Sequence, residues 1–306
     1  MRKNIKFLAV ILIMVPITLF GQKINKGQLL KDIQYLSSEE LEGRKPLSEG
    51  SLKARSYIKE RFASLEMSSQ YPDYTQYFDF QNRREGKLYE NAANIIGFIP
   101  GSESDKLFVV MAHYDHLGRQ GDNILFGADD NASGTAAVLA IAAYFSENRP
   151  SHSMMFVALD AEEMGHQGAK ALVEDFPFSL DQVVLNINMD MISRNDDNEI
   201  YAVGTYHSPF LKPLISEVSD GRNPALIFGH DEPSLGRNDW TRASDHAQFH
   251  DRGVPFIYFG VEDHKDYHKP TDTFENIQPE FYIDAVVLIL DIIIALDKGL
   301  LLSEEK

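Results

Sequence analysis

Residues 111–134 read MAHYDHLGRQGDNILFGADDNASG and decide the fold, because they join a buried strand to a helix through a run of histidine and aspartate side chains. The five residues that end at Met111, LFVVM, are all apolar, as is typical of a parallel strand buried on both faces. His113 and Asp115 are therefore expected at the carboxyl end of that strand, where α/β sheets hold their sites. The small and apolar residues 132–139 predict a helix, so Asp130 lies at its positive end.

Apolar runs and helical patterns alternate along the rest of the chain, which predicts a three-layer α/β fold with a mixed, mostly parallel central sheet and helices on both faces. Because no linker or repeat interrupts this alternation, residues 23–306 are predicted to form a single domain. Pro100 and Gly101 predict a hairpin-like stop. The polar turn at 37–46 favours a solvated loop, and a contact of Arg44 with substrate is the alternative. We expect strands at 77–81, 93–99, 107–111, 154–159, 183–189, 200–203, 225–228 and 255–259, and helices at 26–36, 52–65, 135–145, 167–173, 209–218 and from 279 onward.

The first 22 residues have the pattern of a secretory signal, with three basic residues ahead of or at the start of an apolar stretch at 7–20. A membrane anchor is the alternative, but the apolar core is short for a span and polar residues follow it directly. We therefore expect signal cleavage, export to the periplasm or the extracellular medium, and no stable membrane insertion afterwards. The chain contains no cysteine, so neither a disulfide nor a lipid-modified cysteine is expected.

The net charge of −17 bears on the partners that the protein can bind, and it becomes more negative when the basic signal is removed. A strongly acidic surface repels nucleic acid and anionic membranes, so neither is expected as a partner. Near the end of the chain, Asp291 interrupts the apolar segment 285–296, and Asp284 and Asp297 flank it. These acids favour a helix packed on the sheet over a membrane span.

Carboxylates follow two further apolar strands at the points where those strands end. The pair Glu162 and Glu163 comes after the strand at 154–159, and Asp190 comes directly after the strand at 183–189. Because the carboxyl ends of parallel strands share one edge of a sheet, these acids are expected to converge with the histidine and aspartate side chains of the first stretch. Each acid alone is typical of a solvated loop or a cap, so the prediction depends on their coincidence.

His268 completes the set from beyond the last predicted strand. It stands in the string DYHKPTDT at 266–273, and Pro270 prevents a continuing helix there, so the imidazole can point back into the site. The rival is His264, which would pair with His268 on a helix as a two-histidine zinc motif. Pro270 disfavours that helix, and His268 is therefore the candidate ligand.

In the order and spacing of these strings, the chain resembles the secreted di-zinc aminopeptidases of the bacterial leucyl-aminopeptidase type, whose fold is shared with glutaminyl cyclases. The resemblance covers nearly the whole chain after the signal and implies that residues 23–306 are a zinc-peptidase catalytic domain. The strings that carry it are HYD at 113–115, GADDNASG at 127–134, EEMG at 162–165, NMD at 188–190 and YH at 267–268.

The resemblance implies two Zn²⁺ ions per chain, held by two imidazoles and three carboxylates: His113 and Asp190 on one ion, Glu163 and His268 on the other, and Asp130 bridging both. Zinc favours such nitrogen and oxygen ligands, and manganese or cobalt could substitute. Glu162 would then be the general base, and Tyr267 would donate to the oxyanion, as a tyrosine does in part of the family. Asp115, two residues beyond His113, is expected to orient that imidazole.

The implied activity is hydrolysis of the N-terminal peptide bond of peptides that have a free N-terminus. A glutaminyl cyclase is the first alternative, although its likeness uses one zinc, and the intact triplet Asp129-Asp130-Asn131 favours two. A non-catalytic peptide-binding protein is the second alternative, but such a protein should have lost a ligand or the base. The preferred N-terminal residue and the oligomeric state stay open.

Overall fold

A computed structural model describes residues 23–304, and the predicted signal at 1–22 lies outside the described residues. Eight strands form one sheet in the order β1-β2-β6-β3-β7-β10-β8-β9, and β4 pairs with β5 in a separate two-stranded ribbon. The predicted fold class, a mixed α/β sheet between helical layers, is confirmed. The strands are β1 Thr75–Asn82, β2 Lys87–Ile99, β3 Ser104–His113, β4 Gly118–Gln120, β5 Asn123–Leu125, β6 His152–Leu159, β7 Val183–Met189, β8 Glu199–Val203, β9 Ala225–Phe228 and β10 Phe256–Gly260.

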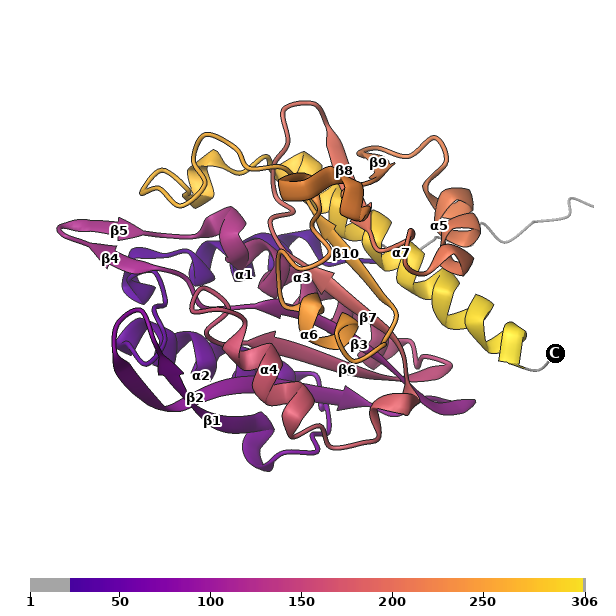
Figure 1. Ribbon diagram of the computed structural model, residues 1–306, viewed down its shortest axis with the longest axis horizontal. Helices are drawn as coiled ribbons and strands as arrows, with labels where there is room; N and C mark the ends of the chain where they lie inside the picture. Colours follow the sequence, from indigo (N-terminus) through magenta and orange to yellow (C-terminus); the bar gives the residue numbers. More distant parts are fainter. Residues whose placement is uncertain (1–22, 305–306) are drawn as a thin grey trace, which may run out of the picture.

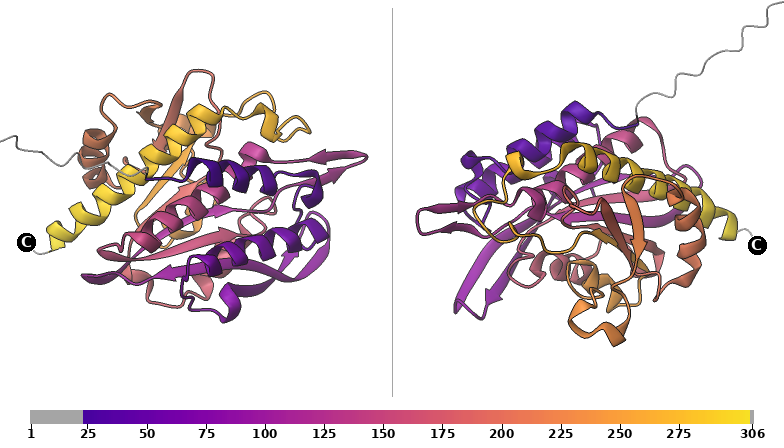
Figure 2. Two further views of the ribbon diagram at one scale, coloured as in Figure 1. Left: turned by 180° about the vertical axis from the view of Figure 1, so that it is seen from behind. Right: turned by 90° about the horizontal axis from the view of Figure 1, so that it is seen from above.

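The helices form the two outer layers of the fold. In Figure 1, α4 and α6 lie in front of the sheet, and the left view of Figure 2 shows α1, α2, α3 and α7 on its other face. Helix α5 packs beside α7. The helices are α1 Lys26–Leu36, α2 Glu49–Ser64, α3 Gly134–Glu147, α4 Gln167–Glu174, α5 Lys212–Ser219, α6 His246–His250 and α7 Pro279–Glu304.

Strand β3 shows how the sheet separates two apolar cores. Phe108 and Val110 belong to the cluster that includes side chains of α1, α2, α3 and α7. Val109 and Met111 belong to the cluster that includes side chains of α4 and α6. Because successive side chains of a strand point to opposite faces, the continuous apolar run fills both cores.

The four central strands β6, β3, β7 and β10 run parallel to one another. Strands β1 and β2 are antiparallel to each other, β2 is antiparallel to β6, and β8 is antiparallel to β10. The carboxyl ends of all four central strands therefore meet at one edge of the sheet. This is the edge where the sequence places its acids and histidines.

The expected hairpin-like stop at Pro100 and Gly101 does not join neighbouring strands, because β6 lies between β2 and β3. The backbone after Gly101 pairs instead with the segment that leads into β6, since the Ser102 amide donates to the Pro150 carbonyl and the Ser104 amide to the Ser151 carbonyl. Local turn residues predict where a strand ends, but they do not predict which later strand pairs with it in the sheet.

The closing helix α7 is anchored through the acids that the sequence analysis singled out. Asp297 accepts hydrogen bonds from the amides of Ser151 and His152, and Asp291 pairs with Lys23 and Arg222. Among the helices within residues 23–304, none is long and apolar enough to cross a membrane.

Candidate metal centre

The candidate site lies at the carboxyl ends of the four parallel strands. His113 is the last residue of β3, Asp190 follows β7, and Glu162 and Glu163 stand in the turn after β6. Asp130 belongs to the helical turn Ala128–Ser133 that leads into α3. The predicted site residues from these three strand ends and this turn therefore come together, as the parallel arrangement requires.

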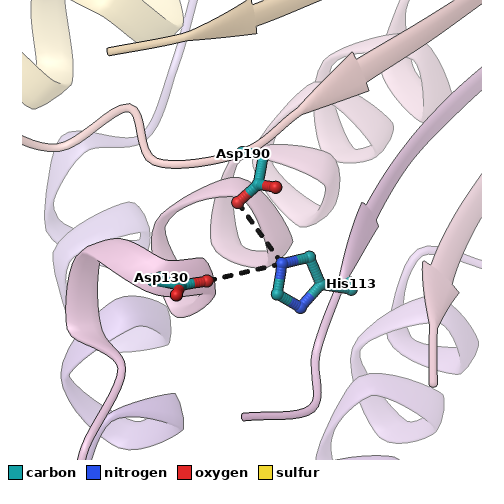
Figure 3. Close-up of side chains that lie close together, drawn as sticks. All are labelled: His113, Asp130 and Asp190. Atoms are coloured by element: carbon teal, nitrogen blue, oxygen red, sulfur yellow. Dashed lines mark hydrogen bonds and ion pairs between the residues drawn. The ribbon is translucent and has the colours of Figure 1, made fainter. Parts of the chain in front are cut away.

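One group of ligand atoms is formed by His113, Asp130 and Asp190 (Figure 3). The Nε2 atom of His113 lies 3.3 Å from Asp190 Oδ1 and 3.5 Å from Asp130 Oδ1. All three residues are buried, and both carboxylates face the same ring nitrogen. A buried imidazole flanked by two carboxylates is an arrangement that suits a zinc ion.

A second group surrounds the other oxygen of Asp130. His268 Nε2 lies 3.1 Å from Asp130 Oδ2 and 3.5 Å from Glu163 Oε2. His116 Nδ1 lies 2.8 Å from Glu163 Oε1 and 3.7 Å from Asp130 Oδ2. Asp130 therefore presents Oδ1 to the first group and Oδ2 to the second, which is what a bridging ligand must do.

His116 is the residue that sequence reasoning missed. It was visible in the string HYDH at 113–116, but spacing alone does not tell which way a side chain beyond a strand points. Its ring is fully buried, and neither ring nitrogen has a hydrogen-bond partner. His268, which was predicted, is the more exposed of the two imidazoles, at 36% of its side chain.

Burial and the neighbouring charges together shift the pKa values of the site residues. Burial, reinforced by Asp190 and Glu163 and opposed by His113, raises the pKa of Glu162 well above its ordinary value. Burial opposes the charged form of His113 too, but Asp190 and Glu162 outweigh it and raise the pKa of that imidazole. Without metal ions, the site is therefore neutralised by protons, and cations could take their place.

Glu163 behaves differently from its neighbour Glu162. Burial alone would raise the pKa of Glu163, yet His116 and His268 hold it below its ordinary value. The two carboxylates differ because they meet different imidazoles: Glu162 Oε1 lies 3.1 Å from His166 Nε2 and its Oε2 lies 4.0 Å from His113 Nε2. Glu163 therefore has the environment of a ligand that stays ionised.

Asp115 supports both the imidazole of His113 and the turn after β6. Its backbone carbonyl lies 3.1 Å from His113 Nδ1, and its Oδ1 lies 3.6 Å from the same nitrogen. Its carboxylate accepts hydrogen bonds from the amides of Glu162, at 3.0 Å, and Glu163, at 3.4 Å. The orienting contact to the ring thus comes chiefly through the backbone, and the side chain fixes the two glutamates instead.

The loop that carries Asp130 is held from behind by buried acids. Asp272 accepts hydrogen bonds from the amides of Asp129 and Asp130 at 2.9 and 3.1 Å. Asp129 in turn accepts from both the amide and the hydroxyl of Ser193, and its Oδ2 lies 3.0 Å from His264 Nε2. The rejected rival His264 is thus directed at Asp129 and not at either ligand group.

Arg44 corrects the prediction of a solvated loop, because its side chain is fully buried. The guanidinium donates to the carbonyls of Tyr114, Phe126 and Gly127 at 2.7, 2.7 and 2.8 Å, and also to that of Leu36. Burial lowers the pKa of Arg44 to about 10, although nearby acids oppose this, so it stays charged at neutral pH. The burial of Arg44 could not be predicted from the sequence, because its four acceptors are backbone carbonyls, which every residue has.

A cavity of about 850 Å³ lies next to the ligand groups. Its lining includes Glu162, Glu163, His166 and Tyr267. Tyr267 stacks on His268, with ring centroids 3.8 Å apart. Burial and the acids Asp130, Asp190 and Glu163 raise the pKa of Tyr267, so the phenol keeps its proton and can donate it in a hydrogen bond. The cavity is therefore large enough for part of a peptide and lined by groups able to move or share a proton.

The site residues fit metal ions, because each group brings buried carboxylate and imidazole atoms to a common point and His116 and Glu163 Oε1 are otherwise unsatisfied. Consistent with this chemistry, the model for the family described as "Peptidase family M28" matches residues 94–293, more than half of the chain. The chain belongs to peptidase family M28. The family resemblance predicted from the sequence is thereby confirmed.

Relatives of this chain include a probable zinc metalloprotease of Pyrenophora tritici-repentis, 26% identical over 67% of this chain and 54% of its own length. The aminopeptidase YwaD of Bacillus subtilis is 29% identical over 62% of this chain and 42% of its own length. The chain thus spans about half the length of these relatives. Among solved structures, a leucine aminopeptidase precursor from Bacteroides thetaiotaomicron matches with a TM-score of 0.71 at 17% identity, over 88% of this chain and 97% of that one, which supports the M28 fold.

Proposed function

We propose that this M28 protein is an exported zinc-dependent aminopeptidase that hydrolyses the N-terminal peptide bond of peptides. The observation that carries the proposal is the double use of Asp130, whose two oxygens face two separate groups of imidazoles and carboxylates beside the cavity. His113 and Asp190 would hold one Zn²⁺, Glu163 and His268 the other, and Asp130 both. Export rests on the signal pattern at 1–22.

Two such ions, when bound, would polarise the scissile carbonyl and lower the pKa of the attacking water. Glu162 would collect the proton of that water and deliver it to the leaving amine, because it lies in the cavity wall and its Oε2 is 4.0 Å from His113 Nε2 of the first ligand group. Tyr267 would donate a hydrogen bond to the developing oxyanion from the cavity wall.

The preference for the N-terminal bond rests on two acids of the site, Glu162 in the cavity wall and Asp190 beside His113. Glu162 and Asp190 are the carboxylates best placed to accept hydrogen bonds from the free α-amine of a substrate. A neutral acetamide in the same place would lose a charge-assisted hydrogen bond worth roughly 1.5 to 3 kcal/mol. A blocked N-terminus should therefore lower kcat/KM by about tenfold to hundredfold.

The test compares a leucyl anilide with its N-acetylated form under identical zinc loading, and Glu162→Gln protein serves as the control for contaminating peptidases. Equal cleavage of the blocked compound, or release of C-terminal residues first, would overturn the aminopeptidase assignment. Cyclisation of glutaminyl peptides without hydrolysis would favour the glutaminyl cyclase alternative. Peptide binding without any turnover would favour the non-catalytic alternative.

A further inference from the structure

We propose that His116 is a fourth protein ligand of the second metal position, beside Asp130, Glu163 and His268. The inference rests on the proposed function, because it assumes that this position holds a metal ion. It adds a residue that neither the sequence resemblance nor the fold assigns.

The first observation is the isolation of the His116 ring. The side chain is fully buried, and both of its nitrogens lack a hydrogen-bond partner. A buried imidazole without hydrogen-bond partners loses the hydrogen bonds that it would make in water, which destabilises the folded state. Because native proteins pair nearly all such groups, a missing partner is expected at this point.

The second observation is the direction of the His116 ring relative to Glu163. Nδ1 of His116 lies 2.8 Å from Oε1 of Glu163, yet this contact lacks hydrogen-bond geometry and Oε1 has no other partner. In the absence of a metal ion, the two atoms attract each other only when the imidazole carries a proton. A cation between them satisfies both atoms, since two ligand atoms on one zinc ion lie roughly 3 Å apart.

The third observation is that the fold holds the ring in place before any ion binds. The backbone of Gly127 packs directly on the imidazole, because a Cβ atom there would lie 2.5 Å from His116 Cγ. The ring of His268 meets that of His116 edge-on, with centroids 5.9 Å apart. His116 is therefore preorganised, in contrast to the partly exposed His268.

This assignment makes the two metal positions unequal. The first position has three protein ligands, His113, Asp130 and Asp190, and the second has four. Zinc sites with four protein ligands are closed, whereas sites with three keep a place for water or substrate. The second position should accordingly bind its ion more tightly, and the first should be the one that substrate reaches.

The test replaces His116 by a residue that cannot bind metal and by one that can. The metal-free protein is titrated with Co²⁺ in competition with a chelator, as wild type, His116→Leu and His116→Cys. His116→Leu should weaken the tighter of two binding steps by at least about tenfold to hundredfold and leave the other unchanged. His166→Leu, which removes a histidine from the wall of the adjoining cavity and not from either ligand group, should leave both steps unchanged.

His116→Cys gives a direct readout of ligation, because a thiolate on Co²⁺ absorbs in the near ultraviolet and the natural chain contains no cysteine. The sulfur takes the place of the ring carbon Cγ, one bond short of Nδ1, and the longer metal–sulfur bond, about 2.3 Å against about 2.0 Å for nitrogen, makes up part of the difference. The band should appear with the first equivalent of Co²⁺ and be absent from wild type. This measurement stands even if His116→Leu fails to fold.

The outcomes separate the two proposals. Wild-type protein that binds fewer than two Co²⁺ ions would overturn the two-metal site of the proposed function. Two ions bound by His116→Leu with wild-type affinities, or two ions bound by His116→Cys without a thiolate band, would overturn the role of His116 and leave the aminopeptidase proposal intact.

Discussion

At the scale of single residues, the neighbours Glu162 and Glu163 are separated by the imidazoles they meet. Glu163 lies between His116 and His268, whereas Glu162 contacts His166 and points toward His113. The same turn after β6 thus supplies one carboxylate with the surroundings of a ligand and another with those of a base. The two glutamates therefore differ in the direction of their side chains and not in residue type.

Glu162→Gln should therefore retain both metal ions and lower kcat by roughly 10²- to 10⁴-fold, as expected when a general base is lost. The measurement combines elemental analysis with steady-state kinetics on a leucyl anilide. Glu163→Gln is the matched control and should lose metal as well as rate. Near-normal turnover by fully loaded Glu162→Gln would assign the base to another residue.

At the scale of elements, Arg44 ties together chain segments that carry the site. Its guanidinium contacts the carbonyl of Tyr114, which adjoins the Asp115-His116 loop, and those of Phe126 and Gly127, which lead to the turn of Asp130. It also contacts the end of α1 at Leu36. One buried cation thus holds together the two loops that converge on the candidate metal centre.

Arg44→Met should destabilise the protein by at least about 3 kcal/mol, because several buried carbonyls lose their donor at roughly 1–3 kcal/mol each. We also expect weaker metal binding, since both ligand loops lose a shared support. Chemical denaturation and metal titration measure the two effects. Arg44→Lys keeps the charge but cannot reach all the carbonyls, so its stability should lie between those of the wild type and Arg44→Met. Wild-type stability in Arg44→Met would show that the loops are held by other contacts.

At the scale of the whole molecule, metal ions should reverse the pH dependence of stability. In the metal-free protein, burial opposes the charge on His268, but Asp130 and Glu163 outweigh it and raise its pKa from 6.5 to about 10. The charged imidazole therefore stabilises the fold fully below pH 6.5, and this contribution is lost as the pH rises through about 10. Metal binding instead weakens as the pH falls, because protons compete for the same ligands.

We therefore expect the Tm of chelator-treated protein to fall between pH 6.5 and 10, and the stabilisation by added Zn²⁺ to grow over the same range. Thermal unfolding across this window, with and without zinc, tests both statements. His268→Gln is the matched variant and should flatten the metal-free curve. A metal-free Tm that rises toward pH 10 would contradict the assignment of His268 to this cluster.

The sequence by itself determined the fold class and the edge of the sheet where the polar groups gather. Continuous apolar runs before His113, Glu162 and Asp190 identify buried strands, and the parallel arrangement then brings the strand ends together. These features are local, since burial on both faces leaves its record in consecutive residues. They could be predicted without knowing which strands are neighbours.

Only the tertiary structure decided what depends on contacts between distant segments. The insertion of β6 between β2 and β3, the burial of Arg44 against four carbonyls, and the direction of the His116 ring all have this origin. In the sequence, Pro270 disfavours His264 and nothing singles out His116. In the structure, Gly127 and Glu163 confine His116 to the site, while His264 contacts Asp129 instead. Backbone acceptors and packing surfaces from elsewhere in the chain have no local pattern, so no spacing rule could have found them.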